Sequence, residues 1–347
     1  MTATTEGDRA RPSQRSREFR QLTLLSSREL IRNSKTMFSM AFMFFFFLIL
    51  IFGIDLAINS NRPDPVVAVT AGPQASAVEK ELDRRGIRLA DGSAATAHIT
   101  VEGGSAQIVL ATTDTPSFKQ LVSAVHTAGI PSAKINVVQA DGSFETDILR
   151  INLPTTLALG FMSIAFTGTT APLVALRKRG TLRLLGTTPV RRLSFIVAQT
   201  PVRAAMGIVE AAIIVGVAWW NGYTEASGVL RLSVTLVLAL GMLFAFAYLF
   251  ASRSSNPELA MNLAGGIIPV IGVFTAGTVF PAELTPEVLR GVFNAFPTAW
   301  FMQAASADIA GTEPFLPVYW LWLMMTAVTV ATGLLAARLF RWDQGDL

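Results

Sequence analysis

The sequence predicts an all-α membrane bundle of six transmembrane helices that carries a small extracytoplasmic α/β domain. One apolar span near the N-terminus is followed by about 90 mostly polar residues, and further apolar spans fill the second half of the chain. Apolar types make up 51% of the 347 residues and charged types only 15%, with a mean hydropathy of +0.48. The core of a soluble protein of this length is too small to bury so many apolar side chains, so we expect a membrane to cover many of them.

The first span covers residues 37–58 and contains the run MFFFFLILIFGI. At 1.5 Å per residue, a helix of this length crosses the roughly 30 Å hydrocarbon core of a bilayer. Thirty-six residues precede it, and the sequence DLAINSNRPDP follows where a small-residue cleavage site would stand. We therefore expect an uncleaved anchor and not a removable signal peptide.

Five further apolar stretches have the length of transmembrane helices. They cover residues 153–176, 193–220, 229–251, 259–280 and 315–340. Segment 281–314 is too interrupted by proline and charge for a span and too apolar for an ordinary loop, so it is expected to form a re-entrant pair of short helices in the outer leaflet. The predicted organisation is a tail with an interfacial helix (1–36), the first span, an extracytoplasmic domain (59–152) and a five-span domain (153–347).

The distribution of Lys and Arg predicts the orientation. Residues 1–36 hold eight basic residues, the loop 177–192 holds six, and 17 of the 28 fall on the side of the two termini. That side is expected to be the cytoplasm. Eight basic residues between positions 62 and 150 do not reverse this assignment, because long domains translocate largely regardless of charge.

Residue usage indicates the compartment. Arg (23) outnumbers Lys (5), and Ala, Gly and Val are abundant, which is typical of a GC-rich bacterial genome. We expect the bacterial cytoplasmic membrane. Because no cysteine occurs, the exported domain is expected to be held by packing without disulfides, and thiol-based metal or redox chemistry is excluded.

The polar segment reads as a small α/β domain. β-branched runs predict strands over 65–72, 97–103 and 106–113, with a hairpin turn at Gly103 and Gly104. Start and stop residues predict helices over 76–86 and 117–129.

The segment 16–36 ahead of the first span is amphipathic, and we expect it to lie along the cytoplasmic membrane surface. Its apolar and basic residues fall largely on opposite faces: Phe19, Leu22, Leu25 and Leu30 on one, and Arg17, Arg28, Arg32 and Lys35 on the other. Anionic lipid attracts such cations. A solvated juxtamembrane helix is the alternative, and the two interpretations are compatible.

The basic loop between the second and third spans holds a predicted short helix. Gly180 and Thr181 are typical of a helix start, Gly186 of a helix end, and Pro189 blocks continuation. Three apolar side chains on this helix are expected to face the cytoplasm and to need a protein partner: Leu182, Leu184 and Leu185. The alternative is that they lie on the membrane interface.

The loop sequence RKRGTLRLLGTTPVRR resembles the cytoplasmic coupling segment of ABC-2 type permeases. The matching residues are Gly180, Thr181, Leu182, Leu184, Leu185, Thr188, Pro189 and Val190. Residues 277–311 are similar to the family's outward region, in which a Phe-Pro and a short helix precede a proline turn and an aromatic-rich re-entrant helix. The family usually carries acidic residues where this chain has Arg177, Lys178, Arg179 and Arg183, so an ATPase partner is expected to have a more acidic groove.

This resemblance implies the membrane subunit of an ABC exporter of the drug or antibiotic efflux type. It implies a second permease subunit, the same or related, and two copies of an ABC ATPase subunit that bind ATP and Mg²⁺. The chain itself has no GxxxxGK[ST] phosphate loop, so it is expected to bind no cofactor and to need that separate ATPase. It also lacks HExxH, and His98 and His126 are expected to be ordinary residues of the outer domain. No enzymatic activity and no nucleic-acid partner is expected.

Three ionisable residues lie in or near predicted spans, where such residues are functional candidates. Asp55 is expected to be an interfacial acid at the outer end of the first span, and Arg203 is expected to snorkel to the cytoplasmic surface. Glu210 lies two helical turns after Arg203 and is a candidate for a packing or substrate-facing polar site.

The cargo is expected to be a hydrophobic or amphipathic compound, such as a drug, an antibiotic or a lipid-like metabolite. The predicted path or gate residues are largely apolar: Phe280, Pro281, Phe296, Pro297, Trp300 and Phe301, with Glu210. Aromatic anchoring at the interface is the alternative for them. Three other functions stay open: a permease for lipid-linked envelope material, a membrane enzyme, and a sensor with an outer domain.

Overall fold

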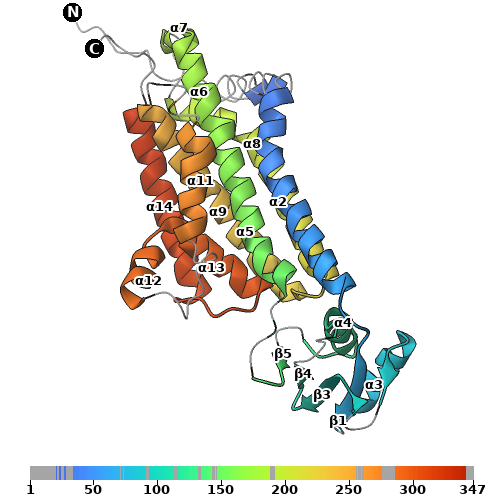
Figure 1. Ribbon diagram of the computed structural model, residues 1–347. Helices are drawn as coiled ribbons and strands as arrows, with labels where there is room; N and C mark the ends of the chain where they lie inside the picture. Colours follow the sequence, from blue (N-terminus) through green and yellow to red (C-terminus); the bar gives the residue numbers. More distant parts are fainter. Residues whose placement is uncertain are drawn as a thin grey trace, which may run out of the picture.

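A computed structural model describes residues 34–340 apart from 71, 73, 91–93, 112–115, 132–133, 143–144, 146, 188–191, 255, 257–258, 260–261 and 276–285, together with residues 21, 23, 24, 27 and 28. The chain forms a helical bundle with an α/β domain at one end (Figure 1). We call this end the domain end and the opposite end, where α7 (Thr181–Gly186) lies, the α7 end. Most of the predicted amphipathic helix over 16–36 lies outside the described residues, and the few that are described are helical.

Five helices among the described residues are long and apolar enough to cross a membrane. They are α2 (Ser34–Ser60), the continuous run of α5 (Ile148–Met162), η3 (Ser163–Thr167) and α6 (Gly168–Lys178), then α8 (Arg192–Trp220), α9 (Ala226–Arg253) and α14 (Val318–Leu339). The spans predicted over 37–58, 153–176, 193–220, 229–251 and 315–340 each coincide with one of these helices. The bundle is therefore confirmed with five candidate spans.

The sixth predicted span, 259–280, is represented by η4 (Leu263–Ile267) and α11 (Ile268–Thr275). This described helix is too short to count as a span by length. The flanking helices α9 and α14 nevertheless run in the same direction (Figure 1). Trp322 in the second turn of α14 donates to Thr235 in the third turn of α9 (Nε1 to Oγ1, 2.9 Å), and the ends of both helices meet at Arg177. The chain between the end of α9 and the start of α14 therefore returns from the α7 end to the domain end (Figure 1).

Two short helices lie at the domain end between α11 and α14 (Figure 1). They are α12 (Glu287–Asn294) and α13 (Pro297–Ile309), and both fall in the segment predicted to hold a helical pair. Pro297 opens α13 because a proline at the first helical position loses no intrahelical hydrogen bond.

The α/β domain contains a five-stranded sheet of order β2-β1-β3-β4-β5. The strands are β1 (Val66–Thr70), β2 (Arg88–Leu89), β3 (Ala97–Glu102), β4 (Ser105–Leu110) and β5 (Ile135–Gln139). Only β3 and β4 pair antiparallel, joined at Gly103 and Gly104, whose φ values of 54° and 79° suit glycine. The predicted strands and hairpin are thus present, whereas β2 and β5 were not predicted.

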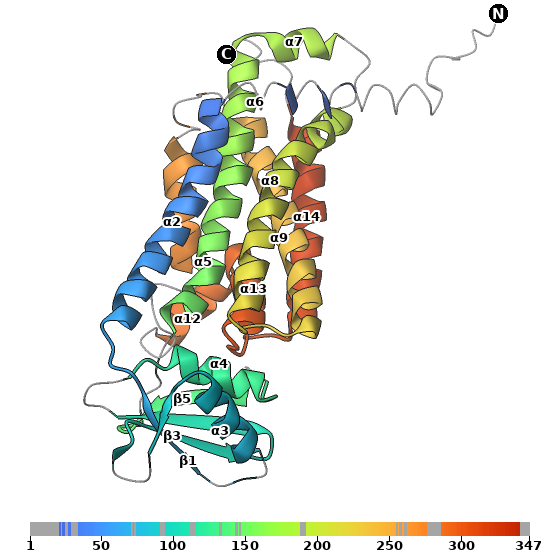
Figure 2. The same cartoon turned by 90° about the vertical axis from the view of Figure 1, so that its right-hand side faces the viewer.

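One face of this sheet is covered by two helices, α3 (Ala75–Arg84) and α4 (Lys119–Thr127), as Figure 2 shows. Alternate residues of β3 and β4, such as Ile99 and Ile108, are fully buried against Leu82 and Leu121 of the helices. His98 points to the opposite face and is exposed. The domain therefore has a core separate from the bundle core.

Candidate functional site

The short helix α7 projects at the end of the bundle away from the domain (Figure 2). Gly180 adopts a φ of 74°, which reverses the chain after α6, and the helix begins at Thr181 as predicted. Leu184 is 71% exposed, but Leu182 is fully buried in the core of the bundle itself. The expectation that Leu182 faces the cytoplasm is therefore wrong, because the face of α7 that carries it packs on the bundle core. Thr188, Pro189 and the side chain of Leu185 lie outside the described residues.

Arg177, which precedes α7, is buried and does not belong to the basic surface of the loop. Its Nη1 donates to the carbonyl oxygens of Ala251 (3.0 Å) and Ser254 (2.7 Å) at the end of α9. Lys178 and Arg179 are exposed. A docking protein can therefore reach these two cations, whereas Arg177 is turned inward.

Arg203 is buried inside the bundle, so the prediction that it snorkels to the surface is wrong. Its Nε donates to the carbonyl oxygen of Gly168 (2.6 Å). In a helix that carbonyl would bond the N–H of residue 172, but Pro172 has none. Arg203 on α8 thus supplies the donor that the proline removes from α6.

Glu210 is 3% exposed, and neither carboxylate oxygen has a hydrogen-bond partner in the described part of the chain. It lies on α8 against Gly160 of α5 and near Phe44 of α2. A β-carbon at Gly160 would collide with the Glu210 carboxylate and would lie 2.9 Å from the Phe44 ring. An unpaired buried carboxyl is costly, which makes this position a candidate for a role beyond packing.

The described residues of the bundle line two open, largely apolar cavities. The larger, ≈720 Å³, lies between α8 and α9, and residues such as Phe161, Gly207 and Leu240 line it, with Ser233 as its polar residue. The second, ≈400 Å³, is lined by residues of α5, η3, α9, α11 and α13, including Phe296 and Pro297 from the predicted gate.

The other predicted gate residues are placed differently. Trp300 is buried and its Nε1 donates to the carbonyl oxygen of Asn294 (2.7 Å), which ties α13 to the end of α12. Phe301 is fully buried and stacks on Phe161, with ring centroids 6.0 Å apart. Phe280 and Pro281 lie outside the described residues. A substrate path through Trp300 or Phe301 would require these contacts to open.

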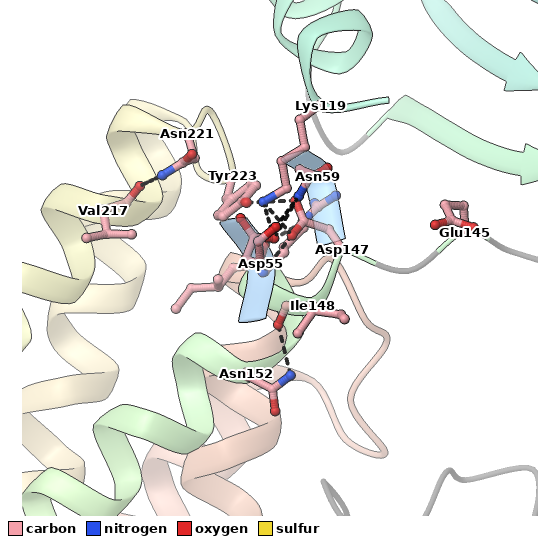
Figure 3. A network of polar contacts seen from close by, with 12 residues as sticks. Asp55, Asn59, Lys119, Glu145, Asp147, Ile148, Asn152, Val217, Asn221 and Tyr223 are labelled. Carbon is pink, nitrogen blue, oxygen red and sulfur yellow. Dashed lines mark hydrogen bonds and ion pairs between the residues drawn. The ribbon is translucent and has the colours of Figure 1, made fainter. Parts of the chain in front are cut away.

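A charged cluster joins the α/β domain to the bundle (Figure 3). Lys119 of α4 lies between two carboxylates, with Nζ 2.6 Å from Asp55 Oδ1 on α2 and 3.2 Å from Asp147 Oδ1 ahead of α5. Tyr223, in the turn between α8 and α9, donates its hydroxyl to Asp147 Oδ2 (2.7 Å). Burial raises the pKa of the Tyr223 phenol, and the Asp147 carboxylate adds to this, so Tyr223 remains a donor.

This cluster was not predicted, because its members come from separate elements. Asp55 lies near the domain end of α2, at the expected end of the first span, but it is paired with Lys119 and mostly buried, so the expectation that water surrounds this carboxylate is wrong. The position of Asp147 could have been predicted in part, because aspartate is typical of the residue that caps the start of a helix. Asp147 is the N-cap of α5 and accepts a hydrogen bond from the backbone N–H of Arg150.

A second ionic contact at the domain end was also missed. Arg231 near the start of α9 bonds the Asp308 carboxylate of α13, whose side chain is fully buried. Arg150 of α5 donates from Nε to the carbonyl oxygen of Ile309 (2.8 Å). The end of α13 is therefore tied to two spans.

Together, the fold and these contacts define a multi-pass membrane protein with a short projecting helix between two spans and apolar cavities in the bundle. Such an arrangement suits a membrane component of a transport system. The family model described as ABC-2 family transporter protein matches residues 96–338, and the chain belongs to this family. No curated protein matches the chain.

Proposed function

We propose that the chain is the permease subunit of an ATP-driven ABC exporter and that α7 docks on a separate ATPase. The observation that carries this proposal is the exposed Leu184 on a short helix that projects between two spans of an ABC-2 family protein. A large exposed apolar side chain beside Lys178 and Arg179 suits a protein surface that combines an apolar pocket with acidic groups. Two ATPase subunits, which hold ATP and Mg²⁺, would act on two permease subunits, the same or related.

The proposed orientation places the α7 end in the cytoplasm and the α/β domain outside. The excess of Lys and Arg in residues 1–36 and in the loop 177–192 supports it. The return of the chain between α9 and α14 supports a sixth crossing in the segment that contains α11. With six crossings, both termini lie in the cytoplasm.

The proposed cargo is a hydrophobic or amphipathic compound that is expelled outward. The two bundle cavities support this class, because their linings are almost entirely apolar. A hydrated sugar or ion would lose water there at several kcal/mol per unsatisfied polar group. ATP binding would bring the ATPases together, move the loop 177–192 and shift the bundle between two states that differ in cargo affinity.

Replacing Leu184 with aspartate tests the docking proposal. The substitution places a charge in a desolvated contact, at a cost of several kcal/mol, so the ATPase is expected to be lost on co-purification and export of amphiphiles to stop. Leu89→Asp, at an exposed position of β2 in the domain, is the matched control and should keep both. Normal recovery of the ATPase with Leu184→Asp would contradict docking through this face of α7.

Deletion of the gene tests the cargo assignment. If deletion depletes a surface polysaccharide, the cargo is lipid-linked envelope material and not a free amphiphile.

Single cysteines test the orientation, because the native chain has none. A cysteine at exposed Ser105, in the α/β domain, is expected to react with an impermeant maleimide in intact cells. One at exposed Thr187, after α7, should react only once the cells are permeabilised. The reverse pattern would show that the proposed orientation is inverted.

A further inference from the structure

The buried cation Arg177 links the helix before α7 to the ends of two other spans. Its Nη1 bonds the carbonyl oxygens of Ala251 and Ser254, and its guanidinium carbon lies 5.7 Å from the ring centroid of Phe340, which follows α14. Because α6 ends one residue later, at Lys178, and α7 begins at Thr181, this contact lies close to the connection between the two helices.

The contact is electrostatically favourable at the end of α9. The last carbonyl groups of a helix have no intrahelical partner and carry the negative end of its dipole, so a guanidinium both satisfies and neutralises them. Two other nitrogen atoms of Arg177, Nε and Nη2, have no hydrogen-bond partner among the described residues, although the residue is only 7% exposed. Removing the guanidinium from water costs free energy, and its hydrogen bonds to two carbonyl groups at the end of α9 offset part of this cost.

The opposite end of α9 is held by an ion pair and a side-chain hydrogen bond. Arg231, in the second turn of α9, bonds the buried Asp308 carboxylate of α13. Trp322 of α14 bonds Thr235 in the next turn. The helix α9 is therefore fixed to α6 at the α7 end and to α13 and α14 at the domain end.

We infer that Arg177 is the positioning residue that transmits movement of α7 through α9 to α13 at the domain end. This inference rests on the proposed function, because the ATPase supplies the movement. Leu182 gives α7 its own apolar attachment to the bundle, whereas Arg177, four residues before α7, joins the last turn of α6 to the end of α9, a helix that reaches α13. Without Arg177, the ends of α6 and α9 lose this polar link, although Thr170 of α6 still bonds the carbonyl oxygen of Ala247 further along α9, so less of the movement of α7 is expected to reach α9.

The first experiment uses the permease alone and tests the contact itself. Ser252 is 2% exposed at the end of α9, so a cysteine there is expected to react slowly with maleimide. Adding Arg177→Met should raise the labelling rate about tenfold, while Lys178→Met, which removes the adjacent exposed cation, should leave it unchanged. Equal rates in Arg177→Met and Lys178→Met would overturn the inference.

The second experiment tests transmission in the complex with the ATPase. Spin labels at Leu56 of α2 and Val288 of α12, both strongly exposed, report the separation of helices at the domain end. ATP is expected to change this distance in the otherwise native complex. In Arg177→Met the ATP-dependent change in this distance should fall about tenfold. In Arg177→Lys, which keeps the charge and a donor, the change should lie between those of Arg177→Met and the native complex.

The outcomes separate the two proposals. An undiminished distance change in Arg177→Met would overturn the role of Arg177 while leaving the permease function intact. If no ATPase binds the native permease, the proposed function fails and the transmission role fails with it, whereas the Ser252 labelling result still reports the contact.

Discussion

Replacing Gly160 with alanine is expected to destabilise the bundle by about 1–3 kcal/mol, because the new methyl group would collide with the Glu210 carboxylate and press on Phe44. Thermal unfolding of the purified protein in detergent measures the loss. Gly216→Ala on α8 is the matched control, since a β-carbon there meets no heavy atom of the described residues within 4 Å.

Glu210→Ala provides the second half of this test. The substitution removes a buried carboxyl that has no hydrogen-bond partner in the part of the chain that the structure describes, so by itself it should leave stability unchanged or raise it. Combined with Gly160→Ala it should restore most of the lost stability. Failure to restore it would show that Phe44 and not Glu210 limits the approach of α5. If Glu210→Ala is stable but alters which compounds are exported, the carboxyl is substrate-facing, whereas unchanged export assigns it to packing.

Replacing Arg231 with methionine is expected to lower the free energy of unfolding by about 1–3 kcal/mol, because it leaves the buried Asp308 carboxylate without the half-exposed arginine that bonds it. The same thermal measurement applies. Arg231→Met with Asp308→Leu should recover most of this stability, since an apolar pair replaces the ionic one. Arg88→Met, at an exposed position of β2, is the control for loss of positive charge. A double variant as unstable as the single one would show that the cost arises from lost packing of the arginine stem.

Elements of the bundle were predictable because each depends on local sequence. A run of about 20 apolar residues predicts a transmembrane helix whatever its neighbours in the bundle are. Five predicted spans coincide with long apolar helices. The same holds for β3 and β4, whose β-branched runs meet at a Gly-Gly turn. β2 and β5 were missed, since β2 has only two residues and β5 is recognisable chiefly by its pairing with β4.

The site was less predictable because it depends on which elements meet. Gly180 and Gly186 predicted the helix α7, but only packing distinguishes buried Leu182 from exposed Leu184. Pro172 inside a span signals a free carbonyl at Gly168, yet nothing local indicates that Arg203 of another span donates to it.

By itself, the sequence determined that this protein is a membrane bundle with an inserted α/β domain, a short basic loop helix and a helical pair before the last span. These features depend on hydropathy, on helix start and stop residues and on runs of β-branched residues. Each of these is a property of neighbouring residues, so the sequence alone shows it. Only the tertiary structure decided the partners of the charged residues: Lys119 between Asp55 and Asp147, Arg231 on Asp308, and Arg177 on the end of α9. A buried charge is stabilised by groups that the fold brings to it from distant positions in the chain. Because these partners are not neighbours in sequence, no local pattern of residues predicts them.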